Sequence, residues 1–431
     1  MSVVSCRRFA FTIVAFAGAA VSWPAVVHSQ DLSGAEREEA AKVLMRPICA
    51  DASLREKVVG EMIARGGEYE KATAKWDMDV VCEQIDLPTD PVHDTADTAD
   101  DASHNNWIYD ARWSPDGKLI ATAGSDGTVR LWDVATGRTV RTIDITKFPS
   151  LEKDDEIKLP SMRPANDRQR VRAARFLGDG RSVVVAADSH PVRIFDVASG
   201  EPIAEVPYVQ ADPEWDMPPF IETTANGFVV LGGYKGEIVV YDPEARAERY
   251  RLPGMPNDYP KFAVSEAAGY LATTARGHDR SVLVQLRKLD TGALIWEAEA
   301  EGDPSAYSMA FSRDGARLAV AVHGNAYVYA TAENKLINTL LIYPTFGSFD
   351  VNFTADGQRL ITGLRHAQLW DIASGKRVHH FGPFSDLCHA IDVSPDGKYL
   401  VTGHMGSDGR IWEIDNGTFF RRLGKNVYPP G

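Results

Sequence analysis

Hydrophobic and polar residues alternate over short segments, separated by turn-forming residues, along most of the chain. The segment Asp110–Gly137 shows this pattern most clearly. Alternation over Ala111–Trp113 is typical of a half-buried strand, the turn Ser114–Gly117 follows, and the apolar run Leu119–Ala123 comes next. A second tight turn leads into Thr128–Asp133. Because proline and glycine stand where such turns need a fixed or positive φ, the pattern predicts a small antiparallel sheet.

Weaker copies of this unit recur as far as the C-terminus. The ends of their third strands are marked by Trp132-Asp133, Phe195-Asp196, Tyr241-Asp242, Leu289-Asp290, Tyr329-Ala330, Trp370-Asp371 and Trp412-Glu413. These markers lie 63, 46, 48, 40, 41 and 42 residues apart. A repeat of this length predicts sheets that cannot bury their apolar faces alone and therefore stack on their neighbours.

The unit resembles the repeat of the WD-repeat β-propeller family, in which each repeat forms one four-stranded blade. His104, Thr122, Asp126 and Trp132 stand where that family places a hydrogen-bond network between the turns and the third strand. The resemblance implies the same structural role for the residues kept in later repeats, which are Thr362, Trp370, Thr402, Asp408 and Trp412.

The fold expected from the repeats is all-β, a seven-bladed β-propeller over residues 104–424 with a short tail at 425–431. Residues 418–423 supply an outer strand for the last blade, so the C-terminus can close the ring without a strand from the N-terminus.

The segment before the repeats follows other patterns. Residues 1–29 combine two arginines, an apolar run and a small-residue cleavage site, which together predict a secretory signal. The apolar run is too short to cross a bilayer, so we expect a periplasmic or secreted protein with no membrane span after removal of the signal. Residues 30–86 have helical periodicity and predict a small α-helical module, and residues 87–103 form an acidic linker.

The interpretation of the cysteines depends on the predicted export. Cys49 and Cys82 lie in the helical module and are the natural disulfide pair in an oxidising compartment. Cys388 lies in a strand pattern and is expected to be a buried thiol. For residues 30–86, the alternative to a module with its own function is that the helices are merely a cap docked on the propeller.

Composition and the absence of certain motifs exclude some classes of function. The formal net charge is −14, which is a poor match for a phosphate backbone, so we expect no nucleic-acid partner. The sequence lacks a phosphate-binding loop, a zinc-protease motif and a nucleophile elbow. We therefore predict no enzymatic activity, no cofactor and no metal, and we interpret Asp126 and Asp408 as structural.

Basic and aromatic residues are expected on one face of the propeller, where they form a candidate binding rim. The turns between second and third strands contain His190, Lys235, Arg276, His278, His323, Arg365, His366 and His404. Aromatic residues at or before first strands reach the same face, namely Trp107, Tyr109, Tyr259 and Tyr307. Aromatic residues at such rims often anchor partners. The alternatives are that hairpin turns are polar in any case and that these aromatics pack between blades.

These observations favour a non-catalytic scaffold that binds a protein partner, because the resemblance implies a rigid platform whose loops bind other proteins. The alternative is a ligand- or glycan-binding propeller, enzymatic or not, that uses the channel mouth. A deep pocket with converging histidine, arginine and aspartate side chains would favour the alternative, and a broad face with exposed aromatics would favour a protein partner.

Overall fold

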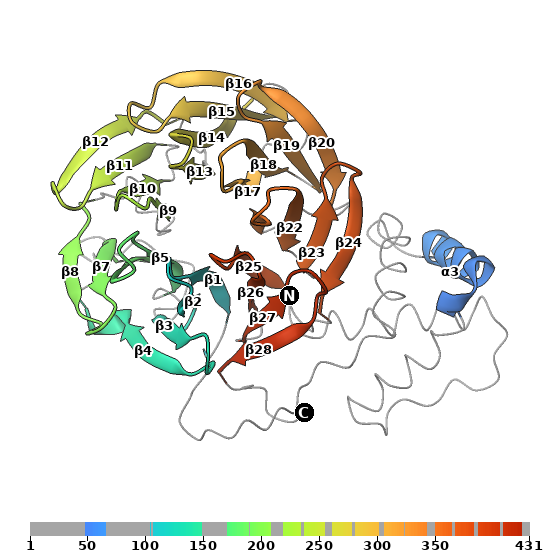
Figure 1. Ribbon diagram of the computed structural model, residues 1–431, viewed down its shortest axis with the longest axis horizontal. Helices are drawn as coiled ribbons and strands as arrows, with labels where there is room; N and C mark the ends of the chain where they lie inside the picture. The colour runs from blue at the N-terminus through green and yellow to red at the C-terminus, as the bar shows by residue number, and fades with distance from the viewer. Residues whose placement is uncertain are drawn as a thin grey trace.

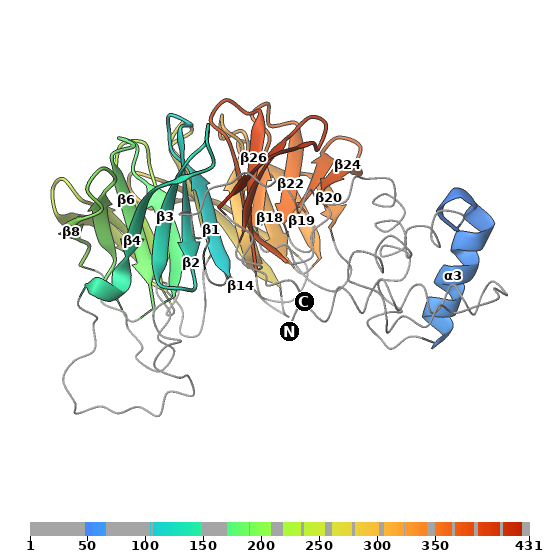
Figure 2. The ribbon, with the colours of Figure 1, turned by 90° about the horizontal axis from the view of Figure 1, so that it is seen from below.

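Seven four-stranded antiparallel sheets form a closed ring around a central channel (Figure 1). The computed structural model describes residues 48–65, 104 and 107–424, the last range with gaps at 149–169, 189, 208–218, 234–236, 255–260, 278–280, 301–305, 323, 343–349, 364–366, 383–386 and 406–407. In each sheet the first strand lines the channel and the fourth lies on the outside (Figure 1). Figure 2 shows the strands running between the two faces of the ring. The prediction of a seven-bladed propeller is confirmed.

The sheets, here called blades, follow one another in chain order. Blade 1 consists of β1 (Ile108–Trp113), β2 (Leu119–Gly124), β3 (Thr128–Asp133) and β4 (Thr139–Asp144), followed by the 3-10 helix η1 (Ile145–Lys147). Blade 2 consists of β5 (Val171–Phe176), β6 (Ser182–Ala187), β7 (Arg193–Asp196) and β8 (Pro202–Glu205). Blade 3 consists of β9 (Phe220–Thr223), β10 (Val229–Gly232), β11 (Ile238–Asp242) and β12 (Ala247–Leu252).

The second half of the ring repeats the same order. Blade 4 consists of β13 (Phe262–Ser265), β14 (Tyr270–Arg276), β15 (Val282–Lys288) and β16 (Leu294–Ala300). Blade 5 consists of β17 (Ala306–Phe311), β18 (Arg317–Val322), β19 (Asn325–Ala330) and β20 (Lys335–Leu341). Blade 6 consists of β21 (Asp350–Phe353), β22 (Arg359–Gly363), β23 (Ala367–Asp371) and β24 (Lys376–Phe381). Blade 7 consists of β25 (Cys388–Val393), β26 (Tyr399–His404), β27 (Gly409–Glu413) and β28 (Phe419–Leu423).

A recurring turn fixes the register between the first and second strands. In blade 1 the Ser114 hydroxyl donates to Asp116 Oδ1 at 2.7 Å and accepts from the Leu119 N–H at 2.9 Å. Gly117 closes the turn at φ +72°, in the left-handed region that favours glycine. Blade 7 repeats the arrangement, with the Ser394 hydroxyl donating to Asp396 Oδ1 at 2.6 Å. The turn is therefore specified by a few local residues, which is why it is visible in the sequence.

Blades are held together by apolar clusters that lie between neighbours. The cluster that closes the ring joins blade 7 to blade 1 and includes Trp113, Trp132, Val401, Ile411 and Leu423. All four strands of blade 7 come from consecutive C-terminal segments, and among the described residues no N-terminal strand pairs with this sheet. Closure therefore rests on side-chain packing between the first and last blades.

The part of the helical module that the structure describes contains α3 (Ala52–Arg65). Asp51 caps this helix, because its Oδ1 accepts hydrogen bonds from the backbone N–H groups of Ser53 at 2.8 Å and Leu54 at 3.2 Å. Residues 30–47 and 66–86 of the predicted module lie outside the described residues. Within the described helices, none is long and apolar enough to span a membrane.

Two cysteines can be compared with the prediction. Cys49 is disulfide-bonded, but Cys82 lies outside the described residues, so the pairing of Cys49 with Cys82 stays a prediction. Cys388 is a free thiol, buried at the start of β25. Burial also raises the pKa of this thiol, so it is held in the protonated, unreactive form.

Candidate functional site at the channel mouth

The first strands of all seven blades line one cavity of about 480 Å³ in the central channel. The start of each first strand pairs with the end of its second strand, as Ile108 does with Gly124. The turn after the second strand therefore emerges at the end of the channel where the first strands begin. We call this end the channel mouth.

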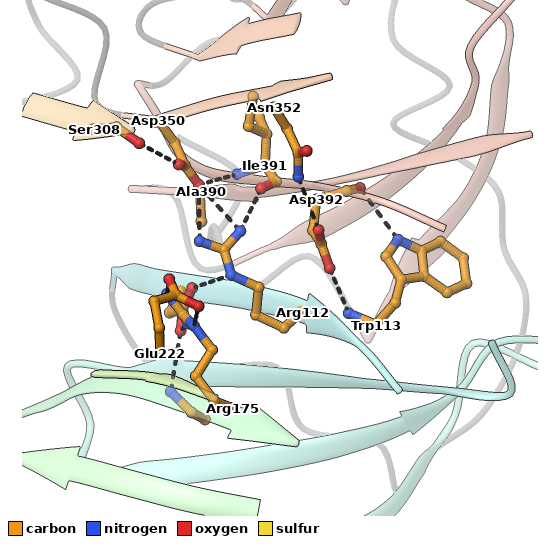
Figure 3. Close-up of polar contacts among 12 residues, drawn as sticks. Arg112, Trp113, Arg175, Glu222, Ser308, Asp350, Asn352, Ala390, Ile391 and Asp392 are labelled. Atoms are coloured by element: carbon orange, nitrogen blue, oxygen red, sulfur yellow. Dashed lines mark hydrogen bonds and ion pairs between the residues drawn. The ribbon is translucent and has the colours of Figure 1, made fainter. Parts of the chain in front are cut away.

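Arg112 on β1 links three blades across the channel (Figure 3). Both of its terminal nitrogens donate to Asp350 Oδ2 on β21, each at 3.1 Å, and its Nε lies 3.3 Å from Asp110 Oδ1. It also donates to the Ile391 carbonyl of β25. The second Asp350 oxygen accepts from the Ser308 hydroxyl of β17 at 2.9 Å. Burial acts to lower the pKa of Arg112, but the neighbouring carboxylates outweigh it and raise the pKa, so the guanidinium stays charged.

Arg175 on β5 extends this network toward blade 3. It forms an ion pair with Asp110 and bonds Glu222 on β9 through Nε at 3.3 Å and Nη2 at 3.2 Å (Figure 3). Asp110 also accepts the backbone N–H of Ala174 at 3.0 Å. Because each of these charges is paired, the network can lie in the channel wall without leaving an isolated charge.

Asp392 joins blade 7 to blades 1 and 6. It accepts the Trp113 backbone N–H at 2.9 Å and the Asn352 side-chain amide at 3.0 Å (Figure 3). The Trp113 indole N–H donates to the Asp392 carbonyl at 3.2 Å. Burial raises the pKa of the Asp392 carboxyl, although Arg112 acts in the opposite direction. These contacts tie the innermost strands to one another independently of the apolar clusters.

An aromatic cluster lies at the mouth, where β1 and β25 begin. Trp107 stacks on His389 with ring centroids 6.1 Å apart, and Tyr109 meets both rings edge-on at 5.9 and 5.8 Å. The Arg172 guanidinium of β5 lies 4.4 Å from the centre of the Tyr109 ring and is fixed by two hydrogen bonds to Asp188. Burial, reinforced by Arg172, lowers the pKa of His389 to about 4, so this ring is neutral at physiological pH.

Lys261 enters the same cavity immediately before β13. Its ammonium lies 3.4 Å from the centre of the Phe220 ring of blade 3. Burial lowers the pKa of Lys261 to about 7, and Asp350 opposes that effect. This side chain is half-buried, and its ammonium is the least compensated charge among the cations of the channel wall that the structure describes.

A second hydrogen-bonded chain lies inside blade 1. His104 Nε2 lies 2.7 Å from the Thr122 hydroxyl, His104 Nδ1 lies 3.0 Å from Asp126 Oδ1, and the Trp132 indole N–H donates to Thr122 Oγ1 at 2.8 Å. Burial lowers the pKa of His104, with Asp126 opposing, so the ring is neutral. Gly124 leaves the room that this chain needs, because a Cβ there would lie 2.1 Å from His104 Nδ1.

Shorter versions of the chain occur in blades 6 and 7. The Trp370 indole donates to Thr362 Oγ1 at 3.1 Å, and the Trp412 indole donates to Thr402 Oγ1 at 3.0 Å. In blade 7 the Thr402 hydroxyl also lies 2.8 Å from Nε2 of His404. His404 therefore occupies the place that His104 has in blade 1.

Comparison with known proteins agrees with this geometry. The family model "WD domain, G-beta repeat" matches residues 101–133 and 375–413, which cover the Trp132 and Trp412 repeats. These two matches end in the first and last of the seven four-stranded blades. The chain contains WD repeats.

Similarity to individual WD-repeat relatives is low. Eukaryotic translation initiation factor 3 subunit I of Candida albicans is 22% identical over 323 residues, covering 72% of this chain and 78% of the relative. Ribosome biogenesis protein erb1 of Neurospora crassa is 21% identical over 301 residues, 70% of this chain and 31% of the relative. Mouse apoptotic protease-activating factor 1 is 31% identical over 94 residues, and that match spans 22% of this chain but only 7% of the relative.

The prediction of a periplasmic or secreted location is wrong. The relatives that align along most of this WD-repeat chain are named for translation initiation and for ribosome biogenesis, which take place inside cells. The inference of export rested on residues 1–29 alone, and these lie outside the described residues.

Two histidines assigned to the binding rim lie inside the WD repeats instead. His404 is 1% exposed, and burial lowers its pKa to about 3. His190 is 7% exposed, and its Nδ1 lies 2.8 Å from the Asp188 carbonyl. The buried His404 ring is therefore neutral near neutral pH and adds no positive charge to the mouth. His190 is also buried, so neither histidine side chain is displayed on the surface of the mouth.

The other predicted rim residues differ in how far the structure describes them. Trp107 and Tyr109 lie half-buried in the aromatic cluster, and Arg276 is exposed at the end of β14. Tyr307 lies on β17, but the structure does not describe its side chain. The rest lie outside the described residues: Lys235, Tyr259, His278, His323, Arg365 and His366.

Sequence reasoning missed the charged channel wall. Arg112 and Arg175 lie within short, mostly apolar strands, where a charged side chain needs a partner of opposite charge. Their position in these strands was the one sequence signal that could have indicated buried ion pairs. Their partners could not be assigned, since Arg112 and Asp350 are 238 positions apart in the sequence. Among the described residues, no group of three or more histidine, cysteine, aspartate or glutamate side chains is arranged to hold a metal ion.

Proposed function

We propose that this WD-repeat protein is a non-catalytic scaffold that binds a protein partner over the channel mouth. The observation that carries the proposal is the half-buried cluster of Trp107, Tyr109, His389 and Arg172. Tryptophan, tyrosine and arginine dominate binding energies at protein interfaces, because they cover a large area with few rotatable bonds.

The cluster is already ordered without a partner. Three rings contact one another, and two hydrogen bonds to Asp188, at 2.9 and 3.0 Å, fix the Arg172 guanidinium. A partner that covers these side chains would lose little additional conformational entropy, so more of the contact energy would remain as affinity.

Basic residues at the same face suggest the character of the partner. Arg276 is exposed at the end of β14, whereas the whole chain carries a net charge of −14. A positive rim on an acidic protein suits an acidic segment of a partner and repels other surfaces of the same sign. The predicted residues outside the described ranges would belong to this proposed rim.

The proposal is tested by affinity purification of the full chain from its native cells, with Trp107→Ser and Arg276→Glu compared with the wild type. The matched control is Ile203→Ser, which changes a side chain that is 55% exposed on outer strand β8. We expect a protein that copurifies with the wild type and the control to be lost with Trp107→Ser and reduced with Arg276→Glu. If Ile203→Ser alone releases it, the partner binds the outer edge and the proposal is wrong.

A further inference from the structure

The channel cavity has two chemically different sides. The charged network comes from blades 1, 2, 3, 6 and 7, and its carboxylates all accept hydrogen bonds or ion pairs. The wall contributed by blades 3 to 5 carries the larger share of apolar residues, including Phe220, Val264 and Phe311, beside the polar residues Glu222, Lys261 and Ser308. A molecule with one polar end and one apolar body would match such a cavity better than a wholly polar molecule.

The Lys261 side chain brings a positive charge to the part of the wall formed by blades 3 to 5. The three arginines of the cavity each have a carboxylate partner: Arg112 has Asp350, Arg175 has Glu222, and Arg172 has Asp188. Among the described residues the Lys261 ammonium has the Phe220 ring as its contact and no ion pair. It is thus the one cavity cation in the described structure that can accept an anion without giving up a protein carboxylate.

We propose that the cavity binds a small organic monocarboxylate, whose carboxylate pairs with the Lys261 ammonium and whose aromatic or branched apolar body lies against the side formed by blades 3 to 5. The volume of about 480 Å³ is within the range of small-molecule sites. A monoanion fits better than a phosphate dianion, because one ammonium balances one charge while Asp350 and Glu222 line the same cavity and repel a second.

The lowered pKa of Lys261 is consistent with this role. Burial holds the amine near its titration point, at about 7, because no carboxylate lies against it. A bound carboxylate would supply the missing charge and shift the amine back toward its protonated form. This inference goes beyond the proposed scaffold function and does not rest on it, because it is argued from Lys261 and the wall of blades 3 to 5, although Tyr109, Arg172 and His389 of the partner-binding cluster line the same cavity.

The test is calorimetric titration of the full chain with phenylacetate and 4-methylpentanoate at pH 6.5, with phenylacetamide as the uncharged analogue. We expect both carboxylates to bind and the amide to bind at least tenfold more weakly. Lys261→Met should weaken carboxylate binding at least tenfold, and the control Lys288→Met, which removes an exposed lysine on β15, should leave it unchanged. Equal binding of acid and amide, no binding of either acid, or unchanged binding by Lys261→Met would overturn the proposal.

A second measurement keeps the test independent of any variant. Brief acetylation of the wild-type protein, followed by peptide mass spectrometry, reports the reactivity of each lysine. Phenylacetate should slow the modification of Lys261 at least threefold and leave Lys288 unaffected. Equal protection of both lysines, or of neither, would contradict a carboxylate seated on Lys261. Loss of the protein partner in Trp107→Ser with retained phenylacetate binding would separate the two proposals.

Discussion

Replacing Trp132 with alanine should be among the most damaging single changes in the propeller. The indole is 1% exposed, donates to Thr122 Oγ1 at 2.8 Å, and packs in the cluster that joins blades 7 and 1. Deleting a large buried aromatic side chain costs about 3–5 kcal/mol. The lost hydrogen bond adds about 1 kcal/mol, because the Thr122 hydroxyl keeps only His104 as a strong partner.

A graded series makes this prediction sharper. Trp132→Phe keeps most of the apolar volume and should cost about 1–3 kcal/mol, since it loses the hydrogen bond and part of the ring. Val140→Ala changes a side chain of the same blade that is 50% exposed and should cost less than about 1 kcal/mol. Urea unfolding followed by circular dichroism gives the three values from the shifts in midpoint. A midpoint for Trp132→Ala equal to that of Val140→Ala would refute the role assigned to the blade 1 network.

Three further predictions concern buried charges and thiols. Burial lowers the pKa of His404 from its ordinary value of 6.5 to about 3 in the folded protein, which therefore binds fewer protons than the unfolded chain below pH 6.5. This group should therefore lower the free energy of unfolding by about 1.4 kcal/mol for each pH unit as the pH drops from 6.5 toward 4. In unfolding titrations of His404→Gln the free energy of unfolding should fall less steeply with pH, by that same amount per pH unit. Arg112→Met should cost about 3–5 kcal/mol in urea unfolding, because it leaves Asp350 buried without its cation, and a change below 1 kcal/mol would contradict the ion-pair network. Non-reducing peptide mapping should recover Cys49 in a disulfide, whereas Cys388 should react with iodoacetamide only after unfolding.

Local signals explain what the sequence predicted well. The Ser-x-Asp-Gly turns recur because each needs only four neighbouring residues and one positive φ, at Gly117 and Gly397 for example. Six of the seven third-strand markers coincide with the ends of strands, and in blade 4 the strand ends at Lys288, one residue before its marker. The long interval before the second marker is an insertion between blades and not a missing blade.

The candidate site was harder to predict because its geometry is not local. His404 follows Thr402 by two positions on β26, so both side chains lie on the same side of the strand, and this spacing could have revealed the histidine as part of the blade 7 network. The pairing of Arg112 with Asp350 depends on closure of the ring and has no counterpart in sequence spacing. Lys261 differs from other lysines only in what surrounds it after folding.

Site-specific photo-crosslinking shows directly whether a protein partner binds over the channel mouth. A benzophenone amino acid placed at Tyr109 in the full chain lies in the aromatic cluster, and the same group at Phe420, 39% exposed on outer strand β28, serves as the control. We expect one discrete crosslinked protein from position 109 in native cells and none from position 420. The same adduct from position 420, with no adduct from position 109, would contradict binding over the channel mouth.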